Sequence, residues 1–572
     1  MKKDVSIVLA GAAGQGIETV AGFMATVLKL SGYYVFVTRE FMSRIRGGTN
    51  SLQLRVSSSP VGAYTSRTDI VIPLTESAIP HLKQYSRLGD ETFYIGEEEF
   101  LAEGKINDAR KFEVPLTSIA EKIGGRIYSN TVATGVVTAL FDIKEDVAVG
   151  YLEKRFGSRG EKVVDQNVEA WKVGMELGKK VMESGKIKFD IERNPEVSEK
   201  LLMSGTDGVA LGAVAGGCNF ISSYPMSPST GVLVFLSQRS QKFGIVVDQA
   251  EDEIAAINKG LGAWYAGGRA MVTTSGGGFA LMTEGLSLAG MHETPMVIHL
   301  AQRPGPATGL PTRTEQGDLQ HVLYAGHGEF PRIVLTPGTP EDAFDLTQRA
   351  FNLADRFQVP VFVLTDQFLV DSSFTSDNID LSKVQIERHI EETEPGYKRY
   401  TITEDGVSAR GIPGYGTGLV GVDSDEHDED GHITEDLNLR PRMVEKRLHR
   451  KLEKIRKESI PPTLYGNEDY KILAVAWGSN YYAVKEALDT IGRDDLAMLF
   501  FKQVYPLSTS MMTYLDRADE VAVIENNATC QFGRVIQFET GFRIPKSNRL
   551  LKYDGLPFSV EQISEFLTRI GG

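Results

Sequence analysis

The stretch formed by residues 224–319 constrains the fold more than any other part of the chain. Three short apolar runs, at residues 245–248, 270–274 and 295–301, are separated by helical patterns of ten or more residues. This alternation is typical of βαβ units in a parallel sheet. A polar, Gly-rich or Pro-containing loop follows each run. Because ligands collect where parallel strands end and helices begin, we expect these loops to form a binding site.

Three acidic residues, Glu251, Asp252 and Glu253, follow the first of these runs. Ile254 and Ile257 then begin a helical spacing of apolar side chains. Acids in the first turn of a helix complement its dipole, and this is the favoured interpretation of Glu251 and Asp252. Glu253 would stand beside the edge of the sheet.

Four segments of this stretch resemble, in the same order, elements of the 2-oxoacid:ferredoxin oxidoreductases: YPMSPST, EDEIAAINKGLGA, TSGGGFALMTEGL and QRPGPATGLPTRTEQGDL. The resemblance implies that Glu253 binds a ring nitrogen of the aminopyrimidine of thiamine diphosphate. A carboxylate bonded there favours the tautomer that removes the thiazolium proton, which makes Glu253 the expected catalytic residue. Tyr224, Pro225, Ser275 and Gly276 are expected to contact the same cofactor.

The same resemblance implies the substrate contacts. Ser227 stands where the family has a threonine, so a hydroxyl able to hold a 2-oxoacid carboxylate is kept while the methyl group is lost. Arg303 matches an arginine that clamps that carboxylate, a role suited to a planar bidentate donor. The alternative for Arg303 is a surface arginine that happens to follow a strand. Arg313, in the same loop, is the second candidate.

Bulk properties exclude several classes of protein. A chain of 572 residues predicts about three or four domains. Its content of 41% apolar and 24% charged residues is ordinary for a soluble protein, and its net charge of −15 argues against a nucleic-acid partner. No apolar run reaches the roughly 18 residues of a membrane span. Asp4 interrupts the N-terminal apolar run, which predicts a cytoplasmic protein and no signal peptide.

The only cysteines are Cys218 and Cys530, far apart in the sequence. They can form neither a disulfide framework nor a cysteine-held iron-sulfur cluster within this chain. Any cluster must therefore come from a partner. Cys530 is interpreted as a packing residue, because no histidine lies near it in the sequence.

The N-terminus predicts a strand at residues 5–10 followed by a glycine-rich turn and a helix. Such a turn lets backbone amides approach a phosphate. Its spacing, GxxGxG, is neither the dinucleotide fingerprint nor a P-loop, and a plain tight turn is equally consistent with it. A nucleotide-binding dehydrogenase built on these glycines is the alternative class of function.

Two segments here, GAAGQGIETVAG and RIRGGTNSLQLRVSSSPV, resemble signatures of the γ domain of the same family. The chain is therefore expected to be a γ-α fusion. In that family the γ domain is associated with coenzyme A, which implies phosphate contacts from Gly14, Gly16, Arg44 and Arg46.

The expected fold class is α/β, with a γ-type α/β domain, a doubly wound domain that binds the thiamine pyrimidine, and a smaller α/β domain like the C-terminal domain of transketolase. The predicted divisions are a γ-type domain at 1–190, a linker at 191–200, the pyrimidine-binding domain at 201–372, an irregular acidic loop and basic helix at 373–465, and the C-terminal domain at 466–572.

Residues 423–436 carry eight acidic residues together with His427 and His432. A metal site is conceivable there, although a solvated loop is the favoured interpretation and this chain is expected to hold no metal. The stretch resembles a loop of the family that covers the site. Residues 440–458 predict a packed amphipathic helix.

No GDG motif occurs in the sequence, although thiamine enzymes use one to hold Mg²⁺ and the diphosphate. The resemblance therefore covers only the pyrimidine half of a thiamine site. It implies a separate β subunit that brings the diphosphate site, Mg²⁺ and a [4Fe-4S] cluster, in an (αβ)2 assembly that reduces ferredoxin. The implied reaction is oxidative decarboxylation of 2-oxoglutarate with coenzyme A to succinyl-CoA. Pyruvate and branched-chain 2-oxoacids are alternative substrates, and a non-catalytic binding subunit is the remaining alternative.

Overall fold

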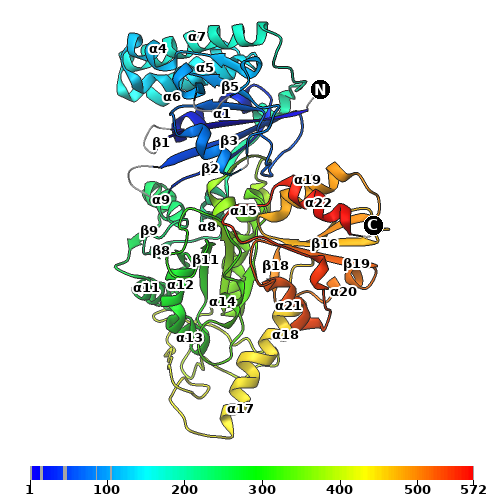
Figure 1. Cartoon of the computed structure of the whole chain (residues 1–572). Coiled ribbons are helices and arrows are strands. Elements are labelled where there is room, and N and C mark those ends of the chain that lie inside the picture. The colour runs from blue at the N-terminus through cyan, green and yellow to red at the C-terminus, as the bar shows by residue number, and fades with distance from the viewer. Residues whose placement is uncertain (1–2, 13–16, 43–47, 86, 103–105, 571–572) are drawn as a thin grey trace. The chain divides into compact units, whose positions relative to one another are not determined.

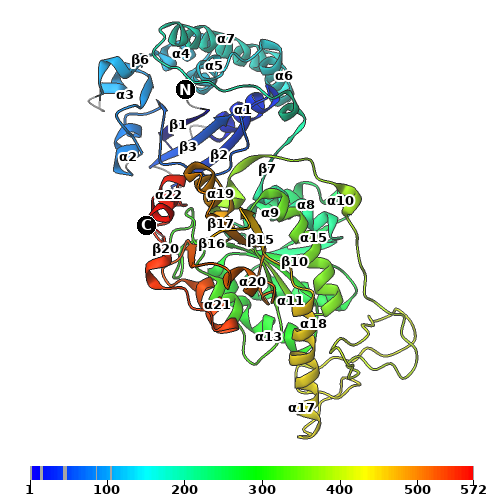
Figure 2. The same cartoon turned by 90° about the vertical axis from the view of Figure 1, so that its right-hand side faces the viewer.

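The computed structural model describes residues 3–12, 17–42, 48–85, 87–102 and 106–570. The chain separates into two compact units (Figures 1 and 2). The first unit comprises the chain up to Met203 with Ser372–Asn378 and Ser559–Glu561, and the second comprises the remainder. The finer domain boundaries expected from the sequence stay a prediction. None of the helices in the described ranges combines the length and the apolar character that crossing a bilayer requires.

The first unit is built on an eight-stranded sheet with the order β6-β5-β4-β1-β3-β2-β14-β7. The strands are β1 Asp4–Ala12, β2 Tyr34–Glu40, β3 Thr49–Ser57, β4 Ile70–Pro73, β5 Phe93–Gly96, β6 Lys111–Glu113, β7 Leu201–Ser204 and β14 Ser373–Ser376. Strands β1, β4, β5 and β6 run parallel, whereas β3 is antiparallel to both β1 and β2. The parallel half therefore has its carboxyl ends on one edge.

The helices of the first unit are α1 Ile17–Leu30, α2 Ala78–Gln84, α3 Glu98–Ala102, α4 Leu116–Ile123, α5 Ser129–Ala139, α6 Glu145–Phe156 and α7 Glu161–Glu183. Ile17, Val20, Phe23 and Val27 of α1 are all buried, as their spacing predicts. Helices α4 to α7 form a layer beyond α1 (Figure 1). Helices α5 and α7 touch through glycines, since a Cβ on Gly174 would lie 2.1 Å from the backbone oxygen of Val132.

The second unit contains a seven-stranded sheet with the order β18-β12-β13-β11-β10-β8-β9. Its strands are β8 Phe220–Ser223, β9 Val246–Gln249, β10 Ala270–Thr274, β11 Met296–Gln302, β12 Ile333–Leu335, β13 Pro360–Asp366 and β18 Gln503–Tyr505. All are parallel except β18, which pairs antiparallel with β12. The chain passes outward from β8 to β9 and then returns to β10, so β8 marks a topological switch point, where doubly wound folds bind ligands.

The helices around this sheet are α8 Gly205–Ala215, α9 Thr230–Gln238, α10 Ser240–Phe243, α11 Glu253–Tyr265, α12 Gly276–Phe279, α13 Thr283–Met291, α14 Leu319–Tyr324, α15 Pro340–Phe357 and α16 Gln367–Asp371. Ser204 and Asp207 form a capping box at the start of α8. Helix α8 packs closely on α15, because a Cβ on Gly208 would lie 2.3 Å from the backbone oxygen of Pro340.

The segment that follows β14 is irregular up to a helical stretch formed by α17 Leu439–Val444, a π-helical segment Glu445–Arg450 and α18 Lys451–Lys457. The predicted helix is thus present, but its apolar stripe is only partly in the core: Ile455 is buried, whereas Val444, Leu448 and Leu452 are half-buried. Lys446 and Lys451 are completely enclosed instead. The wider π turn between the two α-helical parts shifts the helical register, which accounts for the change of buried face.

Glu293 explains why two lysines are buried on this helix. The Nζ atom of Lys446 lies 2.6 Å from its Oε1, and Lys451 binds its Oε2. Arg399 donates to the backbone oxygen of Glu293 at 2.7 Å. The two ammonium groups hold the pKa of Glu293 well below its usual range, against the opposing effect of burial.

The acidic stretch at 423–436 is not a freely solvated loop throughout. His427 is fully buried and its ring centroid lies 3.9 Å from that of Tyr400. Glu426 pairs with Arg447 at 3.2 Å. The described residues contain no group of three or more acidic, histidine or cysteine side chains placed to hold a metal ion.

The C-terminal part of the second unit has a five-stranded sheet with the order β15-β17-β16-β19-β20. Its strands are β15 Thr463–Gly466, β16 Ile472–Trp477, β17 Leu496–Phe501, β19 Glu520–Glu525 and β20 Arg549–Leu551, and its helices are α19 Asn480–Ile491, α20 Met511–Leu515, α21 Gln531–Thr540 and α22 Val560–Arg569. Cys530 precedes α21 and is buried, and burial raises the pKa of its thiol to about 12. A thiol held in this protonated form fits a packing role.

Candidate functional site

Helix α11 places Glu253 at the carboxyl end of the parallel sheet. Asp252 is the N-cap residue, and its carboxylate accepts a hydrogen bond of 2.8 Å from the amide of Ala255. Glu251 is exposed and pairs with Lys259 at 3.1 Å. Asp252 therefore caps the helix, whereas Glu251 lies before the helix and forms an ion pair. Glu253, the first residue of α11, is turned inward and only 3% exposed.

The carboxyl group of Glu253 is buried without a hydrogen-bond partner for Oε1. Burial raises its pKa above the ordinary value. A Cβ on Gly278 would lie 2.4 Å from this Oε1 and 2.3 Å from Oγ1 of Thr274. The last glycine of the TSGGG segment therefore leaves the space that the carboxyl group occupies.

The segment after β10 contributes two further polar features. Ser275 is completely buried, and its hydroxyl oxygen has no partner. At the other end of the glycine run, a Cβ on Gly276 would lie 2.3 Å from Oδ1 of Asp318. Gly276 and Gly278 thus each lie against a carboxyl group.

The loops after β8 and β11 meet through Arg303. Its Nη1 donates a hydrogen bond of 2.6 Å to the backbone oxygen of Ser227. Burial lowers the pKa of Arg303, and the attraction of Asp318 works in the opposite direction. Ser227 and Tyr224 are exposed beside this contact, and Pro225 is half-buried. The structure therefore brings Arg303 and Ser227 into contact, and the roles of the other loop residues in one site stay a prediction.

Arg313 and Ile254 are two further residues that the sequence singled out. Arg313 lies against Gly555, whose Cβ position is 3.1 Å from Cβ of Arg313, and its part in substrate binding stays a prediction. Ile254 belongs to the apolar spacing of α11 but is 49% exposed. It lies on the side of α11 that faces away from the sheet, while Ile257 and Leu261 fill the core.

Asp318 is a site residue that reasoning from the sequence missed. Burial and the neighbouring charge of Glu315 raise its pKa to about 7, while Arg303 lowers it. An acidic residue at the end of the matched QGDL segment was the available signal. Its position just before α14 gives it the appearance of an ordinary helix cap.

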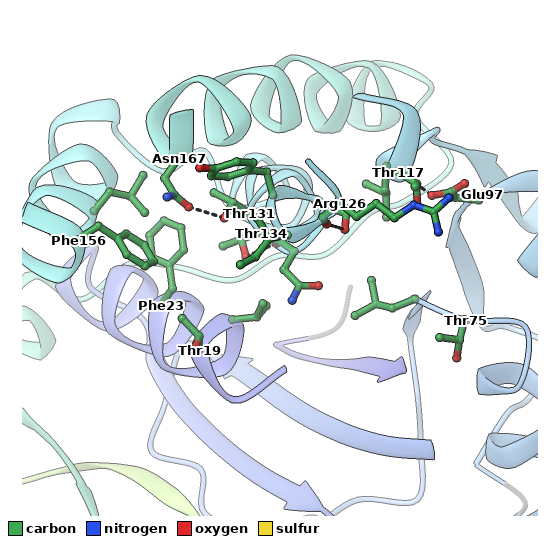
Figure 3. Close-up of a pocket in the computed structure, with 18 of the residues that line it drawn as sticks. Thr19, Phe23, Thr75, Glu97, Thr117, Arg126, Thr131, Thr134, Phe156 and Asn167 are labelled. Carbon is green, nitrogen blue, oxygen red and sulfur yellow. Dashed lines mark hydrogen bonds between the residues drawn. The ribbon is translucent and has the colours of Figure 1, made fainter. Parts of the chain in front are cut away.

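The first unit contains a separate cavity of about 860 Å³ at the carboxyl ends of β4, β5 and β6 (Figure 3). One end is polar: Glu97 accepts a hydrogen bond of 2.6 Å from the amide of Thr117, and Arg126 lies close by. The other end is aromatic, where Phe23 stacks on Tyr151 with ring centroids 5.0 Å apart.

The four residues predicted to hold coenzyme A phosphates, Gly14, Gly16, Arg44 and Arg46, lie outside the described residues. The glycine pair falls between the end of β1 and the start of α1. Thr19 and Val20 of α1 line the cavity.

Comparison with known proteins identifies both parts of the chain. Residues 6–177 match the family model described as pyruvate ferredoxin/flavodoxin oxidoreductase, and residues 211–446 match the model for the thiamine diphosphate-binding part of pyruvate flavodoxin/ferredoxin oxidoreductase. The alpha subunit of the 2-oxoacid:ferredoxin oxidoreductase of Sulfolobus sp is 31% identical, over 99% of this chain and 97% of its own length. The chain belongs to the 2-oxoacid:ferredoxin oxidoreductase family.

Further relatives agree with this assignment. The 2-oxoglutarate synthase subunit KorA of Archaeoglobus fulgidus is 33% identical over 58% of this chain and 89% of its own length. The structure of the 2-oxoglutarate:ferredoxin oxidoreductase from Magnetococcus marinus, solved with 2-oxoglutarate, coenzyme A and succinyl-CoA bound, superposes with a TM-score of 0.91 at 31% identity and covers 99% of both chains. The expected α/β fold of a γ-α fusion is thereby confirmed.

The residues of the site fit the pyrimidine part of thiamine diphosphate. The unpartnered Oε1 of Glu253 needs a donor or a protonated ring nitrogen, and an aminopyrimidine offers both. The glycine run leaves its backbone uncovered beside that atom, where a larger side chain would fill the space. Glu253 and the segment Ser275–Gly276 would therefore hold the ring.

Proposed function

We propose that this chain is the α subunit of an enzyme that oxidatively decarboxylates 2-oxoglutarate with coenzyme A, giving succinyl-CoA, CO2 and reduced ferredoxin. The observation that carries the proposal is the buried carboxyl group of Glu253, unpartnered at Oε1, at the switch point of a doubly wound sheet. The choice of 2-oxoglutarate is supported by the likeness to the Magnetococcus marinus enzyme and to the KorA subunits.

Glu253 is the catalytic residue of this proposal. When bound, thiamine diphosphate supplies a carbon nucleophile for the 2-oxo carbonyl. Glu253 holds the protonated ring nitrogen by a charge-assisted hydrogen bond in a site that excludes water. The hydroxyl of Ser275, which has no partner, is placed in the same wall and orients the ring. Tyr224 and Pro225, in the loop after β8, contact the ring from the opposite side.

Arg303 binds the substrate carboxylate. It is half-buried, and its contact with Ser227 fixes the guanidinium between the two loops. Ser227 is exposed, and its hydroxyl is the second group proposed to bind the same carboxylate. A planar guanidinium can form two parallel hydrogen bonds to a carboxylate, which a lysine cannot. Arg313 is the second arginine of this proposal.

The rest of the thiamine site belongs to a separate β subunit. The chain lacks a GDG motif, and both cysteines are buried. The β subunit therefore supplies the diphosphate contacts, Mg²⁺ and the [4Fe-4S] cluster, and the electrons leave through it to ferredoxin. The assembly is (αβ)2 and cytoplasmic.

Coenzyme A occupies the cavity of the first unit. The cavity combines an aromatic end with a polar end at the edge of a parallel sheet, and an elongated ligand with polar and less polar parts suits it. Phosphates of that ligand are held by Gly14, Gly16, Arg44 and Arg46.

Reconstitution with the β subunit tests the main proposal. The isolated chain should reduce no acceptor, whereas the complex should reduce ferredoxin with 2-oxoglutarate faster than with pyruvate or branched-chain 2-oxoacids. A preference for another 2-oxoacid would reassign the substrate. Acceptor reduction by the isolated chain would overturn the argument that the site is completed by a second subunit.

The coenzyme A proposal has its own test. Thr19→Trp would fill the cavity from α1, and a double change of Arg44 and Arg46 to Ala would remove two positive charges. Both variants should raise the KM for coenzyme A and leave the KM for the 2-oxoacid nearly unchanged. Equal effects on both substrates would indicate a structural role for these residues.

A further inference from the structure

The carboxyl group of Asp318 does not cap helix α14, although its position suggests that it would. Asp318 is the N-cap residue of α14, yet its side chain makes no capping hydrogen bond. The amide of Gln320, which such a cap would satisfy, donates instead to Oε1 of Gln531 at 2.9 Å. Gln531 also donates from Nε2 to the backbone oxygen of Gly317 at 2.7 Å. The carboxyl group of Asp318 is thus free of a structural role in this helix.

The backbone of Asp318 is held firmly, which fixes where the carboxyl group lies. Its amide donates to Oε1 of Gln302 at 3.0 Å, and its backbone oxygen accepts from the amide of Val322 at 2.8 Å. The carboxyl group then rests on Gly276, where a Cβ would lie 2.3 Å from Oδ1 and 2.5 Å from Oδ2. Oδ2 is shielded from solvent and has no hydrogen-bond partner. Such a group is costly to ionise.

The charged groups around Asp318 have opposite effects on its pKa. Burial is the largest influence on its pKa and, with the negative charge of Glu315, raises it to about 7, while Arg303 lowers it. Glu253 approaches the same glycine run at Gly278. His321, one turn along α14, packs edge to face on Phe279 with centroids 4.9 Å apart, and burial lowers its pKa. Arg303 is the nearby cation whose attraction favours the ionised form of Asp318.

We propose that Asp318 takes up a proton when a 2-oxoacid binds, so that the affinity of the site for its carboxylate substrate is linked to protonation. The inference rests on the proposed function, which places the substrate carboxylate on Arg303. An ionised Asp318 competes with that carboxylate for Arg303 and repels it. The substrate therefore binds the form in which Asp318 is neutral. The proton comes from the solvent, and the substrate carboxylates stay ionised.

The direction of the pH dependence follows from this linkage. Well below pH 7 Asp318 is largely neutral in the free site, and binding takes up few protons. Above pH 7 the free site is ionised, and each binding event requires close to one proton. The dissociation constant should then rise about tenfold per pH unit between pH 7 and the pH at which the bound form itself titrates.

Calorimetry on the complete complex with the β subunit and thiamine diphosphate provides the test. The probe is 2-hydroxyglutarate, which keeps both carboxylates of 2-oxoglutarate but lacks the reactive carbonyl. Titration at pH 8 in two buffers of different ionisation enthalpy should show a clearly larger proton uptake per site than the same titration at pH 6. The KM for 2-oxoglutarate should rise over the same interval.

Two variants separate Asp318 from other titrating groups. Asp318→Asn should abolish the proton uptake and flatten the pH profile of KM. Glu315→Gln removes a charge that raises the pKa of Asp318 and should move the midpoint of uptake to lower pH. The inference is wrong if the wild-type complex binds the probe without taking up protons, or if its KM does not depend on pH. It is also wrong if both variants take up protons as the wild type does. A complex that oxidises no 2-oxoacid at all instead contradicts the proposed function.

Discussion

Arg303 donates a hydrogen bond of 2.6 Å from Nη1 to the backbone oxygen of Ser227, which joins the loops that follow β11 and β8. The contact uses the Nη1 nitrogen of the guanidinium, and Arg303 itself is half-buried. In the proposed function this guanidinium is the cation that binds the substrate carboxylate.

Arg303→Lys should weaken 2-oxoacid binding by about 1 to 3 kcal/mol, because the charge is kept while the forked donor is lost. The effect should appear mainly in KM, with a smaller change in kcat. The same substitution at Arg313 discriminates between the two candidate arginines. Steady-state kinetics of the complex over a range of 2-oxoglutarate concentrations measures both, and an unchanged KM in Arg303→Lys would exclude Arg303 as the carboxylate clamp.

Glu253→Gln should lower turnover by roughly a hundredfold or more, since a neutral amide cannot hold the protonated ring nitrogen. Hydrogen exchange at the thiazolium carbon of the bound cofactor should slow to a similar degree and needs no substrate. Glu251→Gln is the matched control, because Glu251 is exposed and forms an ion pair with Lys259 at the surface. Normal exchange in a fully loaded Glu253 variant would return the chain to the class of non-catalytic binding subunits.

Gly278→Ala should abolish binding of thiamine diphosphate or weaken it strongly. The added Cβ would lie 2.4 Å from Oε1 of Glu253 and 2.3 Å from Oγ1 of Thr274, so the carboxyl group would have to move. Gly277→Ala is the neighbouring control, since its Cβ would meet only the backbone oxygen of Ala307 at 3.5 Å. Cofactor titration followed by fluorescence, with the melting temperature of each variant, would distinguish a local clash from misfolding. Equal affinities in the two variants would contradict this geometry.

Several features of the fold and of the candidate site could be predicted from local patterns in the sequence. The helical spacing of α1 predicts its buried face, and the capping box at Ser204 is legible from four consecutive residues. The position of Glu253 at the start of α11 could be predicted because an acid follows the end of a strand there, whereas its catalytic role rests on the family resemblance and stays a prediction. In each case the decisive interactions lie within one turn of helix or one βα unit.

Interactions between distant segments could not be predicted in this way. The sequence suggests that Asp318 caps a helix. The amide that it would cap, that of Gln320, donates instead to Gln531 of the C-terminal part, so the carboxyl group of Asp318 is not used in capping. Through Gln531, α21 of that C-terminal part contacts the loop that carries Asp318. The two buried lysines of the basic helix likewise read as solvated residues until Glu293 is placed between them.

Glu293→Gln should be among the most destabilising single changes in the second unit. Glu293, Lys446 and Lys451 are all essentially inaccessible to solvent, and removing the carboxylate would leave two buried ammonium groups without their counter-charge. Breaking a buried ion pair from one side costs about 3 to 5 kcal/mol, whereas an exposed pair contributes less than about 1 kcal/mol. Glu453→Gln, which removes the exposed partner of Lys457, is therefore the control. Thermal melting should show a clear loss of stability in the first variant and almost none in the second, and the region around α17 and α18 should become sensitive to protease at lower temperature. Equal melting temperatures would mean that the lysines find water or lose their protons at little cost.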